Sequence, residues 1–573
     1  MEHYRPVIYQ LLPRVFSNTK TDDRKFGTIH ENGCGKLNGI TRHVIHQIRK
    51  QGFTHIWFTG IIEHATCTDY SDWGIPGSNS HVVKGRAGSP YAIRDYYDID
   101  PDLAEDIPSR MNEFELLVQR CQKARMGVII DFVPNHVARE YVSDSTPEGK
   151  LALGLADDSS QAFSPDNNFY YLPGQSLQLP DEVKNLPYVK DTDNYNESPA
   201  RATGNDRFTA SPEISDWYET IKLNYGVDYL NNYKKHFDPI PDTWTKMLDI
   251  LLFWGGKEVD GFRCDMAEMV PVEFWNWVIP KVKEKYPDVL FIAEIYNPVA
   301  YLNYIEYGKF DYLYDKVGLY DTLKNVMAGR AQARCITNEW QKLNGLDRHM
   351  LRFMENHDEQ RIASRHFAGN ARAGLPAMAV SVLMNTGPVM LYSGQESGEP
   401  AIGESGFSGD DGRTSIFDYC SMPAHLKWVN DGKYDGGALS KEQNKIFRFY
   451  TRLMNLCHHD VFRSGSFYDL MWCNEDSENF DGKFIYAFVR YYKDRVFLVV
   501  SNFHKEEKKS IRIRFPADLI EKFKEIDFAR ITGKDILKGR LKVLSTGKEI
   551  RHTGLGLVAE PLSAYVFPLK FES

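Results

Sequence analysis

The chain has 573 residues, which is too long for one hydrophobic core, so we expect two or three domains. Its 69 basic and 78 acidic residues give a net charge of −9 with no long basic run, which argues against a nucleic-acid partner and fits a neutral substrate. Aromatic residues make up 13% of the chain. Most of them must lie in the core, but flat rings also stack on the apolar faces of sugars.

The cysteines and the N-terminal segment bear on where the protein works. The 8 cysteines are spread singly, with no CxxC motif, so we expect reduced and mostly packed thiols. The start, MEHYRPVIYQ, has neither a basic n-region nor an uninterrupted apolar h-region, and no later segment is apolar for long enough to cross a bilayer. We therefore expect no membrane partner and a cytoplasmic location, unless a leader peptide has been removed.

Strand-like and helix-like segments alternate from the start of the chain. The apolar run at 7–16 predicts a first strand, the amphipathic segment 41–50 predicts a helix, and the run at 55–62 predicts a second strand. A long loop rich in Gly, Ser, Asp and aromatic residues then continues to residue 101. Loops of this length inside compact domains are usually functional.

The next elements lead into an insertion. A helix at 111–126 and a third strand at 128–133 keep the alternation, but residues 138–245 break it and are dense in Asp, Asn, Pro and Tyr. We interpret this segment as a lobe that is inserted after the third strand.

Alternation returns after the lobe and brings the chain to eight alternating units, counted by their strands. Further helices are predicted at 244–255, 272–286, 299–307, 375–385 and 441–457, and further strands from 261 and at 289–295, 311–317, 350–355 and 389–393. Eight such units predict an α/β fold, a (β/α)8 TIM barrel, whose active end lies at the carboxyl ends of its strands. A second long polar loop, at 394–418, follows the eighth strand and is expected at the same end.

The last part of the chain has a different pattern. From about residue 462, short alternating apolar segments predict an antiparallel β domain of the sandwich type. It carries no catalytic-looking cluster, so we assign it to stability or weak glycan contact. The predicted domains are the barrel at 1–137 and 246–461, the inserted lobe at 138–245 and the C-terminal β domain at 462–573.

Four of the predicted strands end in polar motifs. In GFRCDMAE, Arg263 and Asp265 are two residues apart and leave a strand from the same face, although such a pair alone is often a solvated strand end. Three further apolar runs end in carboxylate, His or Asn: DFVPNH at 131–136, FIAEIYN at 291–297 and FMENHDEQ at 353–360. Buried parallel strands end in this way at a polar catalytic mouth.

These four stretches resemble the four short regions shared by the α-amylase family of retaining α-glycoside hydrolases and transglycosylases. The resemblance implies Asp265 as nucleophile, Glu294 as acid/base and Asp358 as the third carboxylate. It implies substrate-binding roles for the companion residues Arg263, His136, His357, Tyr91 and Asp95. Tyr91 would stack on the sugar at the cleavage point and Asp95 would orient the site. An ordinary surface loop with a buried Tyr is the alternative interpretation.

The residue types fit that chemistry. A retaining glycosidase needs two carboxyl groups about 5 to 5.5 Å apart, one to attack the anomeric carbon and one to protonate the leaving oxygen. Glu294 follows the apolar run LFIA, so partial desolvation favours its protonated form, whereas Arg263 beside Asp265 favours the carboxylate. Asp358 and the two His residues would bind the hydroxyls of the distorted ring.

Three functions remain open. The first is a retaining α-glycosidase that acts on α-glucans or maltooligosaccharides by double displacement, through a covalent glycosyl-Asp intermediate. The second is a transglycosylase or α-glucosyl isomerase with the same catalytic residues. The third is a non-catalytic glycan-binding relative, which would be expected to have lost one of the three carboxylates. Many hydrolases of the family carry Lys-His where this chain has Glu268 and Met269, so the choice of substrate and acceptor stays open.

The usual metal site of the family is altered in this sequence. Many members bind a structural calcium through an Asn matching Asn135, an Asp of the lobe and a backbone carbonyl after the nucleophile strand. In TIKLN, Lys222 stands where that Asp would be, which removes a hard oxygen ligand and adds a repelling charge. We therefore expect no metal and no cofactor, with the Lys222 ammonium linking the lobe to the Asn135 region. The alternative is a solvated surface lysine.

Overall fold

The computed structural model describes residues 5–190, 194–475, 477–523, 530–539 and 541–572. Its central sheet has eight parallel strands in the order β15-β14-β13-β12-β5-β2-β1-β16. These strands are β1 (Val7–Leu11), β2 (His55–Phe58), β5 (Gly127–Phe132), β12 (Gly261–Cys264), β13 (Leu290–Ala293), β14 (Tyr312–Tyr314), β15 (Met350–Leu351) and β16 (Val389–Tyr392). A parallel bridge between Arg352 and Val389 joins the two edges, so the sheet closes and the predicted barrel is confirmed.

Several predicted strands are shorter in the structure. The run 7–16 was predicted as one strand, but β1 ends at Leu11 and Pro13 begins the short helix α1 (Pro13–Phe16), because proline cannot donate to a strand ladder. The seventh strand, predicted at 350–355, is ordered as β15 over two residues only. After β1 the apolar run continues into the buried helix α1, and after β15 it continues into a buried loop.

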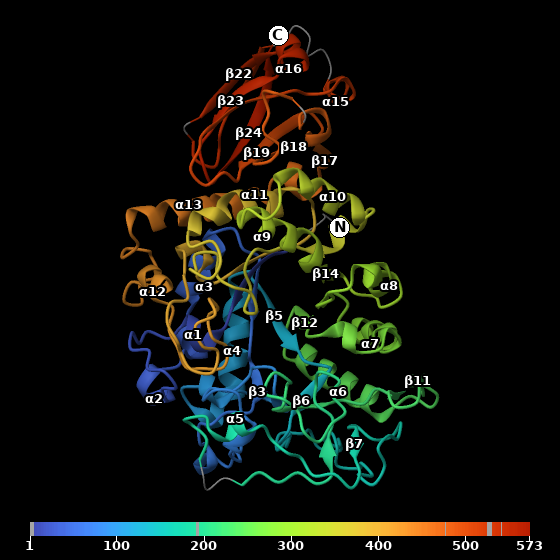
Figure 1. Cartoon of the computed structure of the whole chain (residues 1–573). Coiled ribbons are helices and arrows are strands. Elements are labelled where there is room, and N and C mark those ends of the chain that lie inside the picture. Colours follow the sequence, from blue (N-terminus) through green and yellow to red (C-terminus); the bar gives the residue numbers. More distant parts are fainter. Residues whose placement is uncertain (1–4, 191–193, 476, 524–529, 540, 573) are drawn as a thin grey trace.

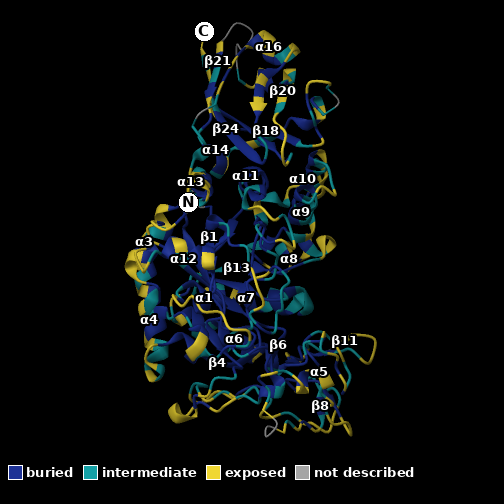
Figure 2. Cartoon of the chain, turned by 60° about the vertical axis from the view of Figure 1, so that its left-hand side comes forward, coloured by how far each residue is buried: buried dark blue, intermediate teal, exposed yellow. Residues whose placement is uncertain are grey.

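Helices surround the barrel. They include α3 (Arg42–Lys50), α4 (Arg110–Lys123), α6 (Asp242–Gly256), α7 (Val272–Lys285), α8 (Tyr301–Glu306), α9 (Asp321–Met327), α10 (Ile336–Lys342), α11 (Gly374–Leu383) and α13 (Lys441–Leu456). The Thr41 hydroxyl accepts the Val44 N–H and so starts α3, and a capping box starts α13. Figure 2 shows that exposed residues gather on outer helices such as α3, while the barrel strands are buried. Among the described residues, no helix is long and apolar enough to span a membrane.

Two excursions from the barrel build the end where the strands finish. The long loop after β2 is in part an antiparallel hairpin of β3 (Ile62–His64) and β4 (Ile93–Ile99). The lobe between β5 and α6 contains the pairs β6 (His136–Ala138) with β9 (Thr220–Lys222), β7 (Tyr171–Leu172) with β8 (Ala200–Arg201), and β10 (Val227–Asp228) with β11 (Lys234–Lys235), together with α5 (Asp181–Lys184). Figure 1 shows these elements at the end opposite the C-terminal domain.

The C-terminal part is an antiparallel β domain, as predicted. A six-stranded sheet has the order β17-β18-β19-β24-β21-β22, and β20 pairs with β23 in a separate sheet. The bounds are β17 (Ser466–Asp469), β18 (Ile485–Tyr492), β19 (Arg495–Asn502), β20 (Lys509–Ile513), β21 (Arg530–Lys534), β22 (Lys542–Thr546), β23 (Leu555–Ala559) and β24 (Ser563–Glu572). All ten residues of α11 are buried, and this helix contacts both β19 and β24, so it connects the barrel to the domain.

Lys222 on β9 fixes the junction between the lobe and the barrel. Its ammonium donates to Asn135 Oδ1, just after β5, and to the Met269 carbonyl at 3.3 Å, just after β12. It also pairs with Asp206 of the lobe at 2.7 Å. The residue is only 2% exposed, which excludes a solvated surface lysine. One cation therefore links the ends of two barrel strands to the lobe.

Replacing Lys222 by Met is expected to lower the free energy of unfolding by about 3 kcal/mol, because Asp206 and two buried oxygens lose their partner. Urea denaturation measures the loss. Lys234→Met, which removes an exposed lysine of the same lobe, is the matched control and should change the value by less than about 0.5 kcal/mol. Equal stability of the two variants would show that the junction does not depend on the ammonium.

Candidate active site

A buried guanidinium lies at the centre of the polar cluster. Arg263 on β12 pairs in register with Asp131 on β5, and two more carboxylates, Asp265 just after β12 and Glu294 just after β13, reach the same side chain. Its Nη1 donates to Asp131 Oδ1 at 3.1 Å and to Asp265 Oδ1 at 2.9 Å, and its Nη2 lies 2.7 Å from Glu294 Oε2. Its Nε donates to the Tyr314 hydroxyl at 3.1 Å. The barrel thus gathers residues of four strands around one cation.

The Glu294 carboxylate is held at both oxygens. Oε1 accepts from the Tyr296 hydroxyl at 2.5 Å, and Oε2 accepts from the Met266 N–H at 2.9 Å. Met266 has φ 43°, in the left-handed region that side chains rarely adopt, and such backbone strain concentrates at functional sites. Asp265 and Glu294 therefore share one guanidinium, and Glu294 is also held by the Tyr296 hydroxyl and the Met266 N–H.

The charges in this cluster do not balance. Three carboxylates, Asp131, Asp265 and Glu294, surround a single guanidinium. Burial raises the pKa of Asp265 well above its usual range, and Glu294 and Asp131 add to the rise, while Arg263 opposes it. The structure therefore places the raised pKa on Asp265, which the sequence predicts as an ionised nucleophile, so burial opposes the form that Arg263 favours.

Asp358 lies beside His357 and Tyr91. His357 Nε2 is 3.0 Å from Asp358 Oδ2 and 2.5 Å from the Tyr91 hydroxyl, and the two rings stack with centroids 5.2 Å apart. Gln10 Nε2 lies 2.8 Å from the other ring nitrogen. Burial opposes ionisation of Asp358, but His357 and Arg263 outweigh it and lower its pKa to about 2. Asp358 thus stays a carboxylate and its side chain is 41% exposed, open to a ligand in the mouth.

His136 lies one layer behind these residues. Its ring lies against Trp217, with centroids 5.1 Å apart, and Asn135 Nδ2 is 3.2 Å from its Nδ1. Burial, aided by the charge of Lys222, lowers the pKa of His136 to about 3, so the ring is neutral. A backbone hydrogen bond also connects it to Tyr91, and it therefore supports the position of that ring.

The structure corrects the role expected for Asp95. Its carboxylate is fully buried and accepts from the Ser143 hydroxyl at 2.6 Å and from the N–H groups of Asp144 at 2.9 Å and Ser145 at 3.0 Å. A substrate cannot reach it, so the substrate-binding role was wrong. Asp95 instead holds the first loop of the lobe against β4, because the β3–β4 hairpin directs it away from the barrel mouth.

Sequence reasoning missed several residues that contact the cluster. Trp57 donates to Asp131 Oδ2 at 3.0 Å, and its ring faces the Arg263 guanidinium at 5.3 Å. Tyr314 is the last residue of β14, and the carboxylate that follows it, Asp315, pairs with Arg352 at 2.9 Å. Of these residues, Tyr296 could have been found from the sequence, because it lies two residues after Glu294 in the same motif. The others are aromatic residues among many, and only the closed barrel brings them to the site.

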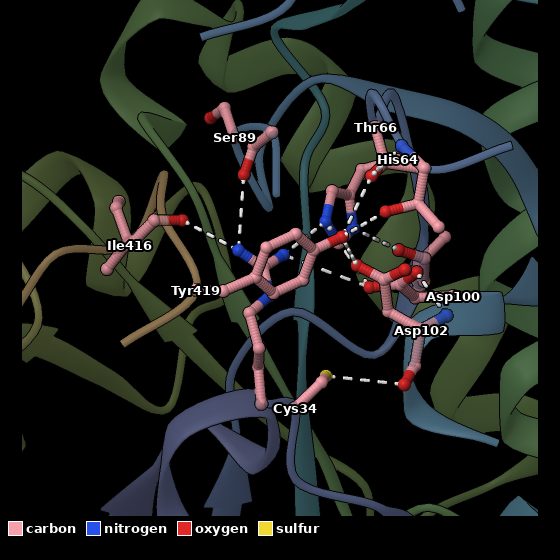
Figure 3. Close-up of polar contacts among 12 residues, drawn as sticks. Cys34, His64, Thr66, Ser89, Asp100, Asp102, Ile416 and Tyr419 are labelled. Carbon is pink, nitrogen blue, oxygen red and sulfur yellow. Dashed lines mark hydrogen bonds and ion pairs between the residues drawn. The ribbon is translucent and has the colours of Figure 1, made fainter. Parts of the chain in front are cut away.

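A second buried polar network joins the loops of the same barrel end (Figure 3). Arg14 Nη2, after β1, lies 2.5 Å from His64 Nε2 on β3, which is 3.3 Å from Asp100 Oδ2 after β4. The Tyr419 hydroxyl, after β16, donates to Asp102 Oδ2 at 2.6 Å. Burial lowers the pKa of His64 to about 3, so Arg14 faces a neutral ring. These contacts fix three long loops relative to one another around the mouth.

Comparisons with known proteins agree with this geometry. A family model described as the α-amylase catalytic domain matches residues 10–465. Alpha-amylase 2 of Dictyoglomus thermophilum is 21% identical over 470 residues, covering 80% of this chain and 64% of that protein. Neopullulanase 2 of Thermoactinomyces vulgaris is 21% identical over 530 residues, covering 89% and 71%. An α-1,4-glucan:maltose-1-phosphate maltosyltransferase of Cereibacter sphaeroides is 27% identical over 224 residues, and the match spans only 33% of that protein and 36% of this chain.

Solved structures support the same fold. An α-amylase from Geobacillus thermoleovorans in complex with acarbose has a TM-score of 0.62 and 19% identity, with 99% of both chains covered. A cyclic α-maltosyl-(1→6)-maltose hydrolase from Arthrobacter globiformis has a TM-score of 0.57 and 17% identity over 99% of both chains. At such identities the likeness concerns the fold. The family model, however, matches most of the sequence itself, and the chain therefore belongs to the α-amylase family and is an enzyme of that family.

Proposed function

We propose that the protein is a retaining α-glycosidase that acts on α-glucans or maltooligosaccharides by double displacement. The observation that carries the proposal is the pair of carboxylates, Asp265 and Glu294, held on one buried guanidinium at the ends of adjacent strands. Two carboxylates bound to one guanidinium lie close together. This suits the retaining mechanism, in which one carboxylate is the nucleophile and the other the acid, better than the inverting mechanism, which needs a wider gap with a water in it.

In the first step, an Asp265 oxygen attacks the anomeric carbon while Glu294 gives its proton to the leaving oxygen. In the second step, Glu294 takes a proton from water, whose oxygen attacks the same carbon and releases Asp265. Asp358, Tyr91 and His357 line the mouth beside this pair and are assigned to the sugar bound at the cleavage point. Arg263 pairs with the Asp265 carboxylate before attack and after its release, and its charge opposes the burial that raises the pKa of Asp265.

The acceptor of the glycosyl group, water or a sugar, is the part of the proposal that has an alternative. The relatives include enzymes named as α-amylases, a neopullulanase and a maltosyltransferase. Where many family hydrolases carry Lys, Glu268 accepts the N–H groups of Tyr296 at 2.9 Å and Asn297 at 3.0 Å. The Glu268 carboxylate holds the loop after β13 in place and is not free to contact a leaving group. Transfer of the glycosyl group to a sugar in place of water is therefore the alternative function. A non-catalytic role fits less well, because all three carboxylates are present.

We also propose that no calcium ion is needed at the junction of lobe and barrel. The oxygens of Asn135 and Met269 already accept hydrogen bonds from the Lys222 ammonium, so the residues present do not fit a cation there.

The function is tested by incubating the enzyme with maltooligosaccharides, starch, sucrose and trehalose and following the products by proton NMR. Hydrolysis of an α-1,4-glucan with the α-anomer formed first is the expected result, because double displacement retains configuration. The β-anomer formed first would overturn the mechanism, and longer or isomerised sugars would identify a transferase. Repeating the incubation at 25 °C in EDTA should give the same products at the same rate, since the junction holds no metal.

Asp265→Asn is expected to lower kcat by about 10⁴-fold or more, because the amide cannot attack the anomeric carbon. Circular dichroism and the melting temperature should show a folded protein. Asp288→Asn, which changes an exposed carboxyl in the turn before β13, is the matched control and should retain full activity. Substantial turnover by the Asp265 variant would count against the nucleophile assignment.

Asp131→Asn is expected to shift the acid limb of the pH profile of kcat/KM to lower pH. The Asp131 charge contributes to the raised pKa of Asp265, so removing that charge stabilises the Asp265 carboxylate and lets the nucleophile ionise at lower pH. The position of the limb, and not the absolute rate, is the readout. A limb that stays in place or moves to higher pH would contradict the coupling.

A further inference from the structure

Four carboxylates gather where the lobe leaves the barrel. Glu63 lies on β3, Asp95 and Asp98 on β4, and Asp144 in the first loop of the lobe. Glu63 is the register partner of Asp95, and the register shifts on both sides of Glu63, which marks a bulge in the hairpin. One carboxylate oxygen each from Glu63, Asp98 and Asp144 lies within 4.8 Å of the other two.

The nearby cations do not neutralise this cluster. Arg110 Nη2 contacts Asp98 at 2.5 Å, and Arg94 Nη1 is 3.9 Å from Glu63 Oε1. Four carboxylates against two guanidiniums leave two negative charges in excess. Asp95 is stabilised by hydrogen bonds from the lobe loop, but the other acids meet one another in a largely buried position, where unbalanced charge is costly.

Glu63 provides a second, independent observation. Its side chain is 2% exposed, and its Oε2 accepts no hydrogen bond from any described residue. Ser78, which lines the same small cavity, has an Oγ that is likewise without a partner in the described part of the chain. A buried carboxylate oxygen without a donor is destabilising, unless something outside the protein chain contacts it.

We propose that Glu63, Asp98 and Asp144 bind a calcium ion. Calcium takes oxygen ligands at about 2.3 to 2.6 Å in flexible geometry, so one ion can reach three oxygens that lie within 4.8 Å of one another. Magnesium requires about 2.1 Å and a regular octahedron and gives up its bound waters reluctantly, so we expect it to bind three protein carboxylates less tightly than calcium does. A single divalent ion also balances the two excess charges.

The ion attaches the lobe to the β3–β4 hairpin, at a place separate from the Lys222 junction. Glu63 and Asp98 belong to the hairpin that follows β2, whereas Asp144 belongs to the lobe and is exposed, which gives the ion a route in. A proton is the competing occupant. Burial, together with the charge of Asp95, raises the pKa of Glu63 to about 9, so without a cation this carboxyl is neutral at pH 7.

The test is a calorimetric titration of the chelator-treated full chain with calcium chloride, with magnesium chloride as a parallel titration. One calcium per chain, weaker binding of magnesium and a higher melting temperature in calcium are expected. Asp144→Asn should weaken calcium binding at least tenfold. Asp166→Asn removes another exposed carboxylate of the lobe and is the matched control, with unchanged binding.

Glu63→Gln separates the ion from the proton. If calcium binds there, this variant loses calcium binding although it keeps the size of the side chain. If Glu63 is merely protonated, the variant leaves any calcium response unchanged, and the proposal is overturned. No binding to the wild-type chain at 1 mM calcium, a concentration at which weak extracellular sites fill, would overturn it as well. Turnover at 25 °C is not a readout, so the outcome is independent of the catalytic assignment.

Discussion

The pairing of Arg263 with three carboxylates is the interaction on which the catalytic end of the molecule depends. A guanidinium with no exposed surface is strongly disfavoured unless its charge is matched, and here the partners come from separate strands. The strands β5, β12 and β13 must therefore pair in the correct register before the charge is satisfied. The same requirement sets the positions of Asp265 and Glu294, so the geometry needed for chemistry and the stability of the barrel have a common origin.

The lobe shapes the mouth without contributing to this cluster. Among the contacts that attach it are the Lys222 ammonium at the ends of β5 and β12, the Asp95 carboxylate under residues 143–145, and the pairing of β6 with β9. All three act through buried polar groups, which are directional. Attachment of this kind fixes the orientation of a loop-rich lobe more narrowly than an apolar contact of equal area.

Local pattern predicted the barrel and the lobe, and the polar ends of four apolar runs carried the resemblance that implied the three carboxylates. Local pattern did not predict the side-chain contacts that depend on how segments distant in the sequence meet. Asp95 lies in the same loop as Tyr91, but its carboxylate accepts hydrogen bonds from residues 143–145 of the lobe. Trp57 and Tyr314 could not be separated from other core aromatics. The helices α9 and α10, between β14 and β15, were missed because they are short and carry weak apolar patterns.

The order of the strands has a consequence for the chain during synthesis. Strand β1 pairs with β2 on one side, but its other partner, β16, lies near residue 389. At ribosomal rates of about 5 to 20 residues per second, β1 is made tens of seconds before β16, and one edge of β1 is unpaired during that time. That edge is apolar and carries open N–H and C=O groups, which are a template for pairing with another chain. The N-terminal segment is thus the part of the nascent polypeptide that most needs shielding from its neighbours until the barrel can close.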